Sequence, residues 1–151
     1  MTIVEATRRI RAPAAQLFAL SQDYTLRTEW DPFTGRMAFQ DGATETKPGT
    51  KVTFTSRQGL TMEVEFVTVR PPRTVAMKMI RGPWFFARFA GSWTFDEGDG
   101  VTDVTFRYSF RARPAALAWA LAPIFRRELR MRLEGMRRAA EESDLLTRLA
   151  A

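Results

Sequence analysis

The 151-residue sequence contains no histidine and no cysteine. Ser-His-Asp and Cys-His nucleophile systems, imidazole bases and Cys/His metal sites all need one of these residue types, so the sequence excludes them. Disulfide bonds are excluded for the same reason. Any chemistry must come from Asp, Glu, Arg, Lys, Tyr, Ser or Thr, and we expect neither a metal nor a cofactor.

Long apolar runs and phosphate-binding loops are also missing. The longest stretch without a polar side chain, residues 115–125, has 11 residues, whereas a membrane-spanning helix needs about 20. Residues 2–11 carry charges where a secretory signal has its apolar core, so we expect a cytoplasmic protein. The turn Gly98-Asp99-Gly100 is not followed by Lys and Ser or Thr and is no phosphate loop.

The chain has a hydrophobic content of 45%, enough for one domain with its own core. The first ten residues predict a strand, and Pro13 opens a short helix that ends near Gln22, followed by a second at 24–30. Beyond residue 35, apolar residues recur at every second position between turn signals, which predicts strands at 36–40, 50–57, 61–70, 73–81, 88–96 and 101–112.

The spacing of the apolar residues changes in the last part of the chain. Residues 114–143 carry an apolar stripe with helical spacing, and Pro123 predicts either a kink or a division into two helices. Each predicted strand has one polar face, so we expect an α+β fold. An antiparallel sheet would bury its apolar face under this C-terminal helix.

Four stretches carry a family resemblance: ATRRIRAPAAQLFALSQDYTLRTEWDP (6–32), GSWTF (91–95), VTFRYSF (104–110) and LAPIFRRELRMRLEGMRRAAEE (121–142). With the element order, they resemble the SRPBCC or START-like helix-grip superfamily, which includes birch-pollen-allergen-like proteins, and within it the bacterial polyketide cyclase/dehydratase-like branch. The resemblance covers nearly the whole chain and implies a single domain over 1–151. It implies a curved antiparallel sheet of about seven strands around the long C-terminal helix, with two short helices after strand one.

The resemblance also implies a cavity between sheet and helix for a lipid, polyketide or isoprenoid-like ligand, and hence binding or transport of a small hydrophobic molecule. Inward-facing positions predict its lining. The expected ligand-binding residues are Arg8, Trp30, Phe54, Val64, Phe66, Met77, Met79, Trp93, Tyr108, Leu129, Leu133 and Met136. The alternative is that the same aromatic and methionine side chains fill a dry core.

Three residues are candidates for catalysis: Asp31, Arg8 and Tyr108. Arg8 and Tyr108 fall on the inward phase of their strands and could bind a ligand oxygen, while Asp31 could remove a proton. Each has a structural alternative, because Arg8 can pair with an acid, Tyr108 can bond a backbone carbonyl, and Asp before Pro commonly forms a turn. On the turn interpretation, Asp31→Asn should only loosen that turn. No second acid falls on the inward phase of a strand, which favours a carrier over a polyketide-type cyclase or dehydratase.

A further candidate site is an aromatic edge. In a meander, the 58–60 turn, the 81–88 connection and the start of the last helix meet at one edge of the sheet. We expect a ligand portal there, formed by Trp84, Phe85, Phe86, Leu117, Trp119 and Leu121. Arginines follow at 126, 127 and 130, and aromatics beside arginines suit a membrane interface. Weak contact with anionic membranes, docking on a protein partner, or packing as an ordinary lid remain alternatives.

The formal charge of +6 is concentrated in one region. Residues 107–138 hold nine arginines against Glu128 and Glu134. Such a stripe either attracts nucleic acid or anionic lipid or forms a solvated helix face with pairs four apart, such as Glu128/Arg132 and Glu134/Arg138. The polar face of the sheet alternates acids with bases and no nucleic-acid module is visible, so we expect no nucleic-acid partner.

Overall fold

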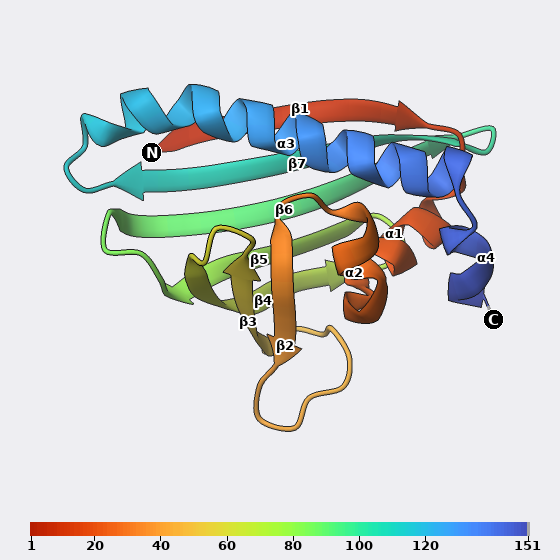
Figure 1. Ribbon diagram of the computed structural model, residues 1–151, viewed down its shortest axis with the longest axis horizontal. Helices are drawn as coiled ribbons and strands as arrows, with labels where there is room; N and C mark the ends of the chain where they lie inside the picture. The colour runs from red at the N-terminus through yellow and green to blue at the C-terminus, as the bar shows by residue number, and fades with distance from the viewer. Residues whose placement is uncertain (151) are drawn as a thin grey trace.

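A computed structural model describes residues 1–150 (Figure 1). Seven strands form one antiparallel sheet in the order β1-β7-β6-β5-β4-β3-β2, which curls around the long helix α3. This confirms the expected helix-grip fold. The strands are β1 (Thr2–Ile10), β2 (Thr34–Phe39), β3 (Lys51–Ser56), β4 (Thr61–Arg70), β5 (Thr74–Arg81), β6 (Phe86–Gly98) and β7 (Val101–Ala112). The helices are α1 (Ala14–Gln22), α2 (Tyr24–Trp30), α3 (Leu117–Glu142) and α4 (Leu145–Ala150).

The hairpin between β6 and β7 shows how local sequence sets the register. Asp99 and Gly100 both have positive φ angles, of 55° and 77°, as a two-residue type I′ turn requires. This turn places Trp93 opposite Phe106, and their rings stack with centroids 3.7 Å apart. Every second residue of β7 from Thr102 to Phe110 is buried, so the predicted alternation is confirmed.

The helix α3 covers the apolar face of the sheet and lies along β1 and β7 (Figure 1). Leu129, Leu133 and Met136 on its inner face are fully buried, and each such side chain stabilises the fold by about 1.5–3 kcal/mol. Pro123 lies exposed inside α3, which remains one helix of 26 residues. Of the two alternatives predicted for Pro123, the division into two helices therefore does not occur.

The structure also differs from the sequence-based prediction at the element ends. The strand β6 extends two residues further at each end than predicted, and β2 begins two residues earlier. The short helix α4 was not predicted. Its Leu145 is buried, and its Arg148 forms an ion pair with Glu29 of α2. Among residues 1–150, no helix combines the length and apolar character that crossing a membrane requires.

Candidate functional site

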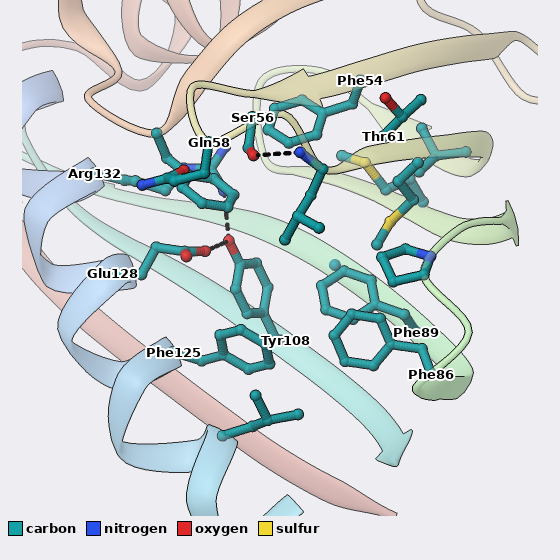
Figure 2. Close-up of a pocket in the computed structure, with 18 of the residues that line it drawn as sticks. Phe54, Ser56, Gln58, Thr61, Phe86, Phe89, Tyr108, Phe125, Glu128 and Arg132 are labelled. Atoms are coloured by element: carbon teal, nitrogen blue, oxygen red, sulfur yellow. Dashed lines mark hydrogen bonds between the residues drawn. The ribbon is translucent and has the colours of Figure 1, made fainter. Parts of the chain in front are cut away.

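A cavity of about 320 Å³ lies between the sheet and the first half of α3 (Figure 2). Its volume falls within the range of small-ligand pockets, about 300–1,000 Å³. Most of the wall is aromatic or aliphatic, with side chains from β3 to β7 facing side chains from α3. The main apolar lining residues are Phe33, Phe54, Met62, Val64, Met77, Phe86, Phe89, Phe106, Leu121 and Phe125.

Gly91 helps to keep this space open. It lies on β6 at the floor of the cavity, and a Cβ added there would meet nothing closer than 3.8 Å. A larger residue at position 91 would therefore project its side chain into free volume. In the other half of the molecule, by contrast, the space between sheet and helix is filled, because Trp30 packs edge-on against Trp93 at 6.2 Å.

The predicted ligand-binding residues divide between these two halves. Phe54, Val64, Met77 and Tyr108 line the cavity. The remaining apolar candidates do not border it. Most of them lie toward the end of the sheet that α1 and α2 cover, whereas Met79 lies beside Gly82 and Met62, close to the cavity. These core residues are Trp30, Phe66, Trp93, Leu129, Leu133 and Met136, which are buried, and Met79, which is partly buried. For them the dry-core alternative applies.

Arg8 lies outside the cavity. Its side chain is 48% exposed and forms an ion pair with Glu134 on α3, at 3.1 Å. Because β1 is an edge strand beside α3, an inward-phase side chain can pass the helix and reach solvent. Arg8 therefore does not line the cavity as expected, and the ion pair with Glu134 matches its acid-pairing alternative.

Asp31 lies at the end of α2 and is fully buried between two arginines. Its carboxylate accepts hydrogen bonds from Arg132 Nη2 at 2.9 Å and from Arg27 Nε at 2.8 Å. It also accepts bonds from the Phe33 amide and the Thr34 hydroxyl, at 3.0 and 2.9 Å. Burial alone would raise the pKa of Asp31, but the charges of Arg132 and Arg27 outweigh burial and hold this pKa well below its usual range.

Because its oxygens are occupied and it does not border the cavity, Asp31 is not placed to remove a proton from a ligand. The turn interpretation is confirmed by the Phe33 bond, but it covers only part of the role of this residue. The larger part is to hold two buried guanidinium groups, a role that was not predicted from the sequence.

Tyr108 connects this ion cluster to the cavity. Its hydroxyl accepts a hydrogen bond from Arg132 Nη1 and donates one to Glu128 Oε2, at 2.6 Å. Both bonds are visible in Figure 2. Burial raises the pKa of Tyr108 well above its usual value, so the phenol stays protonated. Burial also raises the pKa of Glu128, although the bond from Tyr108 and the charge of Arg132 oppose this effect.

The family model described as polyketide cyclase/dehydrase and lipid transport matches residues 1–141. The chain belongs to this family. No curated protein matches the sequence significantly. This membership supports either hydrophobic ligand binding or a polyketide cyclase role.

Solved structures with the same fold share little sequence with this member of the polyketide cyclase/dehydrase family. A START superfamily protein from Mycobacterium smegmatis has 14% identity and a TM-score of 0.72, with 89% of this chain and 96% of that one covered. Ara h 8.0201 has 14% identity and a TM-score of 0.73, covering 94% and 99%. The di-domain ARO/CYC BexL from the BE-7585A biosynthetic pathway has 16% identity and a TM-score of 0.73, covering 93% of this chain but 48% of BexL. These likenesses establish the fold alone.

The sequence did not lead us to predict the three charged residues that line the cavity, Arg27, Glu128 and Arg132. The predicted ion pair between Glu128 and Arg132 does not form within the described chain, because Arg132 turns to Asp31 and Tyr108 instead. One signal was available. Glu128 and Arg132 directly precede the stripe residues Leu129 and Leu133, so they lie at the edge of the buried face of a helix.

The three segments expected to meet at one edge do meet at the mouth of the cavity. Leu60, Phe85 and Ile124, one from each segment, all line it. Of the predicted portal residues, Phe85, Phe86 and Leu121 line the cavity, while Trp84 is 73% exposed and packs its ring edge-on against Phe85, at 5.9 Å. Leu117 packs on the core, and Trp119, 89% exposed, borders a separate hollow with Thr2 and Pro123. Neither residue borders the cavity: Leu117 lies one turn before Leu121 on the same face of α3, whereas Trp119 lies on an exposed face.

Proposed function

We propose that this protein binds and carries a small hydrophobic molecule in the cavity between the sheet and α3. The observation that carries the proposal is an apolar cavity of about 320 Å³ with one polar end, formed by Tyr108 and Glu128. An empty apolar cavity destabilises a fold in proportion to its volume. A ligand that fills it would offset this cost by removing its own apolar surface from water.

Gly91 gives a direct test. Gly91→Leu should fill the cavity from its floor without displacing the backbone, since the first added atom has only ordinary contacts. Gly98→Leu is the matched control, because Gly98 ends the same strand, does not line the cavity, and an added Cβ there would meet nothing within 4 Å. We expect Nile red to bind the natural protein and the Gly98→Leu variant, and to lose at least about tenfold in affinity for Gly91→Leu. Equal binding by all three proteins would contradict the proposal.

A polyketide-type cyclase or dehydratase is the second candidate function. The observation that favours it is Glu128, an acid with a raised pKa that lines an apolar cavity, as a general base requires. The test is hydrogen exchange at the carbon beside the carbonyl of 2-tetralone, followed by NMR in heavy water. Acceleration by the natural protein that disappears in Glu128→Gln would favour an enzyme, whereas exchange at the uncatalysed rate would favour a carrier.

We further propose that the ligand enters through the mouth between Leu60, Phe85 and Ile124, and that this rim touches anionic membranes weakly. The exposed apolar side chains around the opening support this, because a lipid-like ligand must be shielded from water as it enters. An adaptor that docks on a protein partner through the same rim is the alternative.

A further inference from the structure

The hydrogen bonds at the polar end of the cavity have a fixed direction. A guanidinium group has no acceptor, so Arg132 can only donate to Tyr108. The Tyr108 hydroxyl has a single proton, and its other partner is Glu128 Oε2. The proton must therefore point to Glu128. The two bonds form a hydrogen-bond chain that runs from Arg132 through Tyr108 to the Glu128 carboxylate.

Asp31 holds the start of this chain in place. The Nε and Nη2 groups of Arg132 bind its carboxylate at 2.9–3.1 Å, which leaves Nη1 to reach Tyr108. Since both Asp31 and Arg132 are buried, water does not compete strongly for these bonds. The donor-to-acceptor direction of the hydrogen-bond chain is thus set by the core of the protein and not by the ligand.

The hydrogen-bond chain ends on the carboxylate of Glu128. Glu128 is a lining residue, and no group within residues 1–150 donates a hydrogen bond to its second oxygen, Oε1. Figure 2 shows its carboxylate beside the Tyr108 hydroxyl, on the opposite side of the cavity from Phe86 and Phe89. The polar end therefore presents an acceptor in a mostly apolar lining, in which Ser56, Gln58 and Thr61 are the other uncharged polar side chains besides Tyr108.

We propose that the cavity selects hydrophobic molecules that carry a hydroxyl group, as a phenol, enol or alcohol, and that this hydroxyl donates to Oε1 of Glu128. This inference rests on the proposed function and names its ligand class. Hydrophobic carboxylates are disfavoured, because their charge would lie next to that of Glu128 in a poorly solvated space. Ethers and hydrocarbons of the same shape can bind, but without the hydrogen bond.

A set of three-ring probes separates these classes at nearly constant shape. We would measure the affinities of 9-phenanthrol, 9-methoxyphenanthrene, phenanthrene and phenanthrene-9-carboxylate by displacement of Nile red. A hydrogen bond to a charged group in such a site corresponds to about tenfold or more in affinity. We therefore expect the phenol to bind at least about tenfold more tightly than its methyl ether, and the carboxylate to bind most weakly.

The variant Glu128→Gln tests the role of the free oxygen. Its carbonyl can still accept a hydrogen bond from Tyr108. The amide NH₂ then takes the place of the free oxygen, so the end of the hydrogen-bond chain changes from an acceptor to a donor. The preference for phenol over methyl ether should disappear or invert. Glu5→Gln is the control, because Glu5 pairs with Arg107 away from the cavity, and it should retain the preference of the natural protein.

A pH series on the natural protein gives the same test without a variant. The ionisable groups that face Glu128 are Tyr108 on β7, Arg132 on its own helix, and Asp31 beyond Arg132. Tyr108 stays protonated, Arg132 stays charged and Asp31 stays ionised in mildly acidic solution. Protonation of Glu128 would make its second oxygen a donor, so the preference for the phenol should fall as pH decreases, with no such trend for phenanthrene.

The outcomes distinguish this inference from the proposed function. Equal affinity for phenol and methyl ether, or an unchanged preference in Glu128→Gln, would overturn the inference and leave the proposed carrier intact. Failure of Nile red and of all four probes to bind the natural protein would overturn both.

Discussion

The guanidinium of Arg132 on α3 binds both carboxylate oxygens of Asp31, 101 positions earlier in the chain. Arg27, four residues before Asp31, binds the same carboxylate from α2. Two arginines and one aspartate thus form a buried cluster in which each charge depends on the others. This cluster joins α3 to α2 and, through Tyr108, to the sheet, so it positions the polar end of the cavity.

Substitution of Asp31 should therefore be severe. Asp31→Asn would leave two buried guanidinium groups without a carboxylate, and breaking a buried pair in this way costs about 3–5 kcal/mol. This predicted loss is larger than the loosened turn that the sequence suggested, and the two predictions can be told apart by measurement. Urea unfolding followed by tryptophan fluorescence would measure the loss of stability. The control is Asp103→Asn, because Asp103 forms an exposed ion pair with Arg9. A change for Asp31→Asn as small as that of the control would contradict the buried-cluster account.

The same carboxylate should make the protein sensitive to acid. The folded-state pKa of Asp31 lies well below its unfolded value of about 3.9. Its contribution to the free energy of unfolding is therefore present above about pH 4–5 and lost as pH falls toward the folded-state pKa. We expect the stability difference between the natural protein and Asp31→Asn to narrow from pH 6 to pH 3, as measured by urea unfolding. A difference that stays constant over this range would show that the charge of Asp31 has no part in stability.

The fold was predictable from the sequence because its signals are local. Strands such as β7 alternate buried and exposed residues, and turns such as Asp99-Gly100 have distinctive residue types. The cavity was less predictable, since Trp93 and Phe89 occupy the same inward phase of β6 but only Phe89 borders free volume. That difference depends on where α1 and α2 close the sheet.

The ion cluster illustrates a second limit. Arg132 and Glu128 belong to a helix with many charges, and spacing alone suggests that such residues pair with each other in solvent. Their burial depends on how α3 is oriented against the sheet, a tertiary property. Tyr108 was found because its strand has a clear inward face, but its partners lie on another element, 20 and 24 positions away.

Gly135 allows the close approach of α3 to the end of α2. A Cβ at this position would lie 2.1 Å from the carbonyl oxygen of Trp30, a backbone atom that cannot move without shifting Asp31. Gly135→Ala should therefore destabilise the protein by about 1–3 kcal/mol or more, although alanine favours helices over glycine. Thermal unfolding would measure this effect, with Gly98→Ala as the control because nothing lies within 4 Å of its added Cβ. An unchanged or raised melting temperature for Gly135→Ala would contradict the close contact.

Glu128 should cost the protein stability at neutral pH. Its folded-state pKa is raised, chiefly by burial, so its favourable contribution is present below its unfolded pKa of about 4.3 and is lost as pH rises through the folded value. Glu128→Gln removes this titration. The variant should therefore gain stability relative to the natural protein as pH increases from 4 to 8, as measured by urea unfolding at each pH. A constant difference between the two proteins would indicate that Glu128 is not held in a desolvated site.

The proposed membrane contact depends on the apolar rim of the cavity. Trp84 and Ile124 are 73% and 59% exposed. Ile124 lines the cavity mouth with Leu60, and Arg127 follows it by three residues on α3. Each arginine close to an anionic surface contributes about 1 kcal/mol, and salt screens this attraction. We expect the natural protein to float with vesicles containing anionic lipid at low salt, and to dissociate as salt is added.

Three variants identify the surface that is used. Trp84→Ser combined with Ile124→Ser should weaken vesicle binding, because these side chains would enter the interface, and the triple change Arg126, Arg127 and Arg130 to Gln should reduce its salt dependence. Trp119→Ser is the control, since Trp119 is even more exposed than Trp84 but borders a different hollow on α3. If Trp119→Ser weakens vesicle binding as much as the rim variant does, another face of α3 contacts the membrane. Absence of binding at low salt would leave the rim as the edge of a ligand cavity with no role at a membrane.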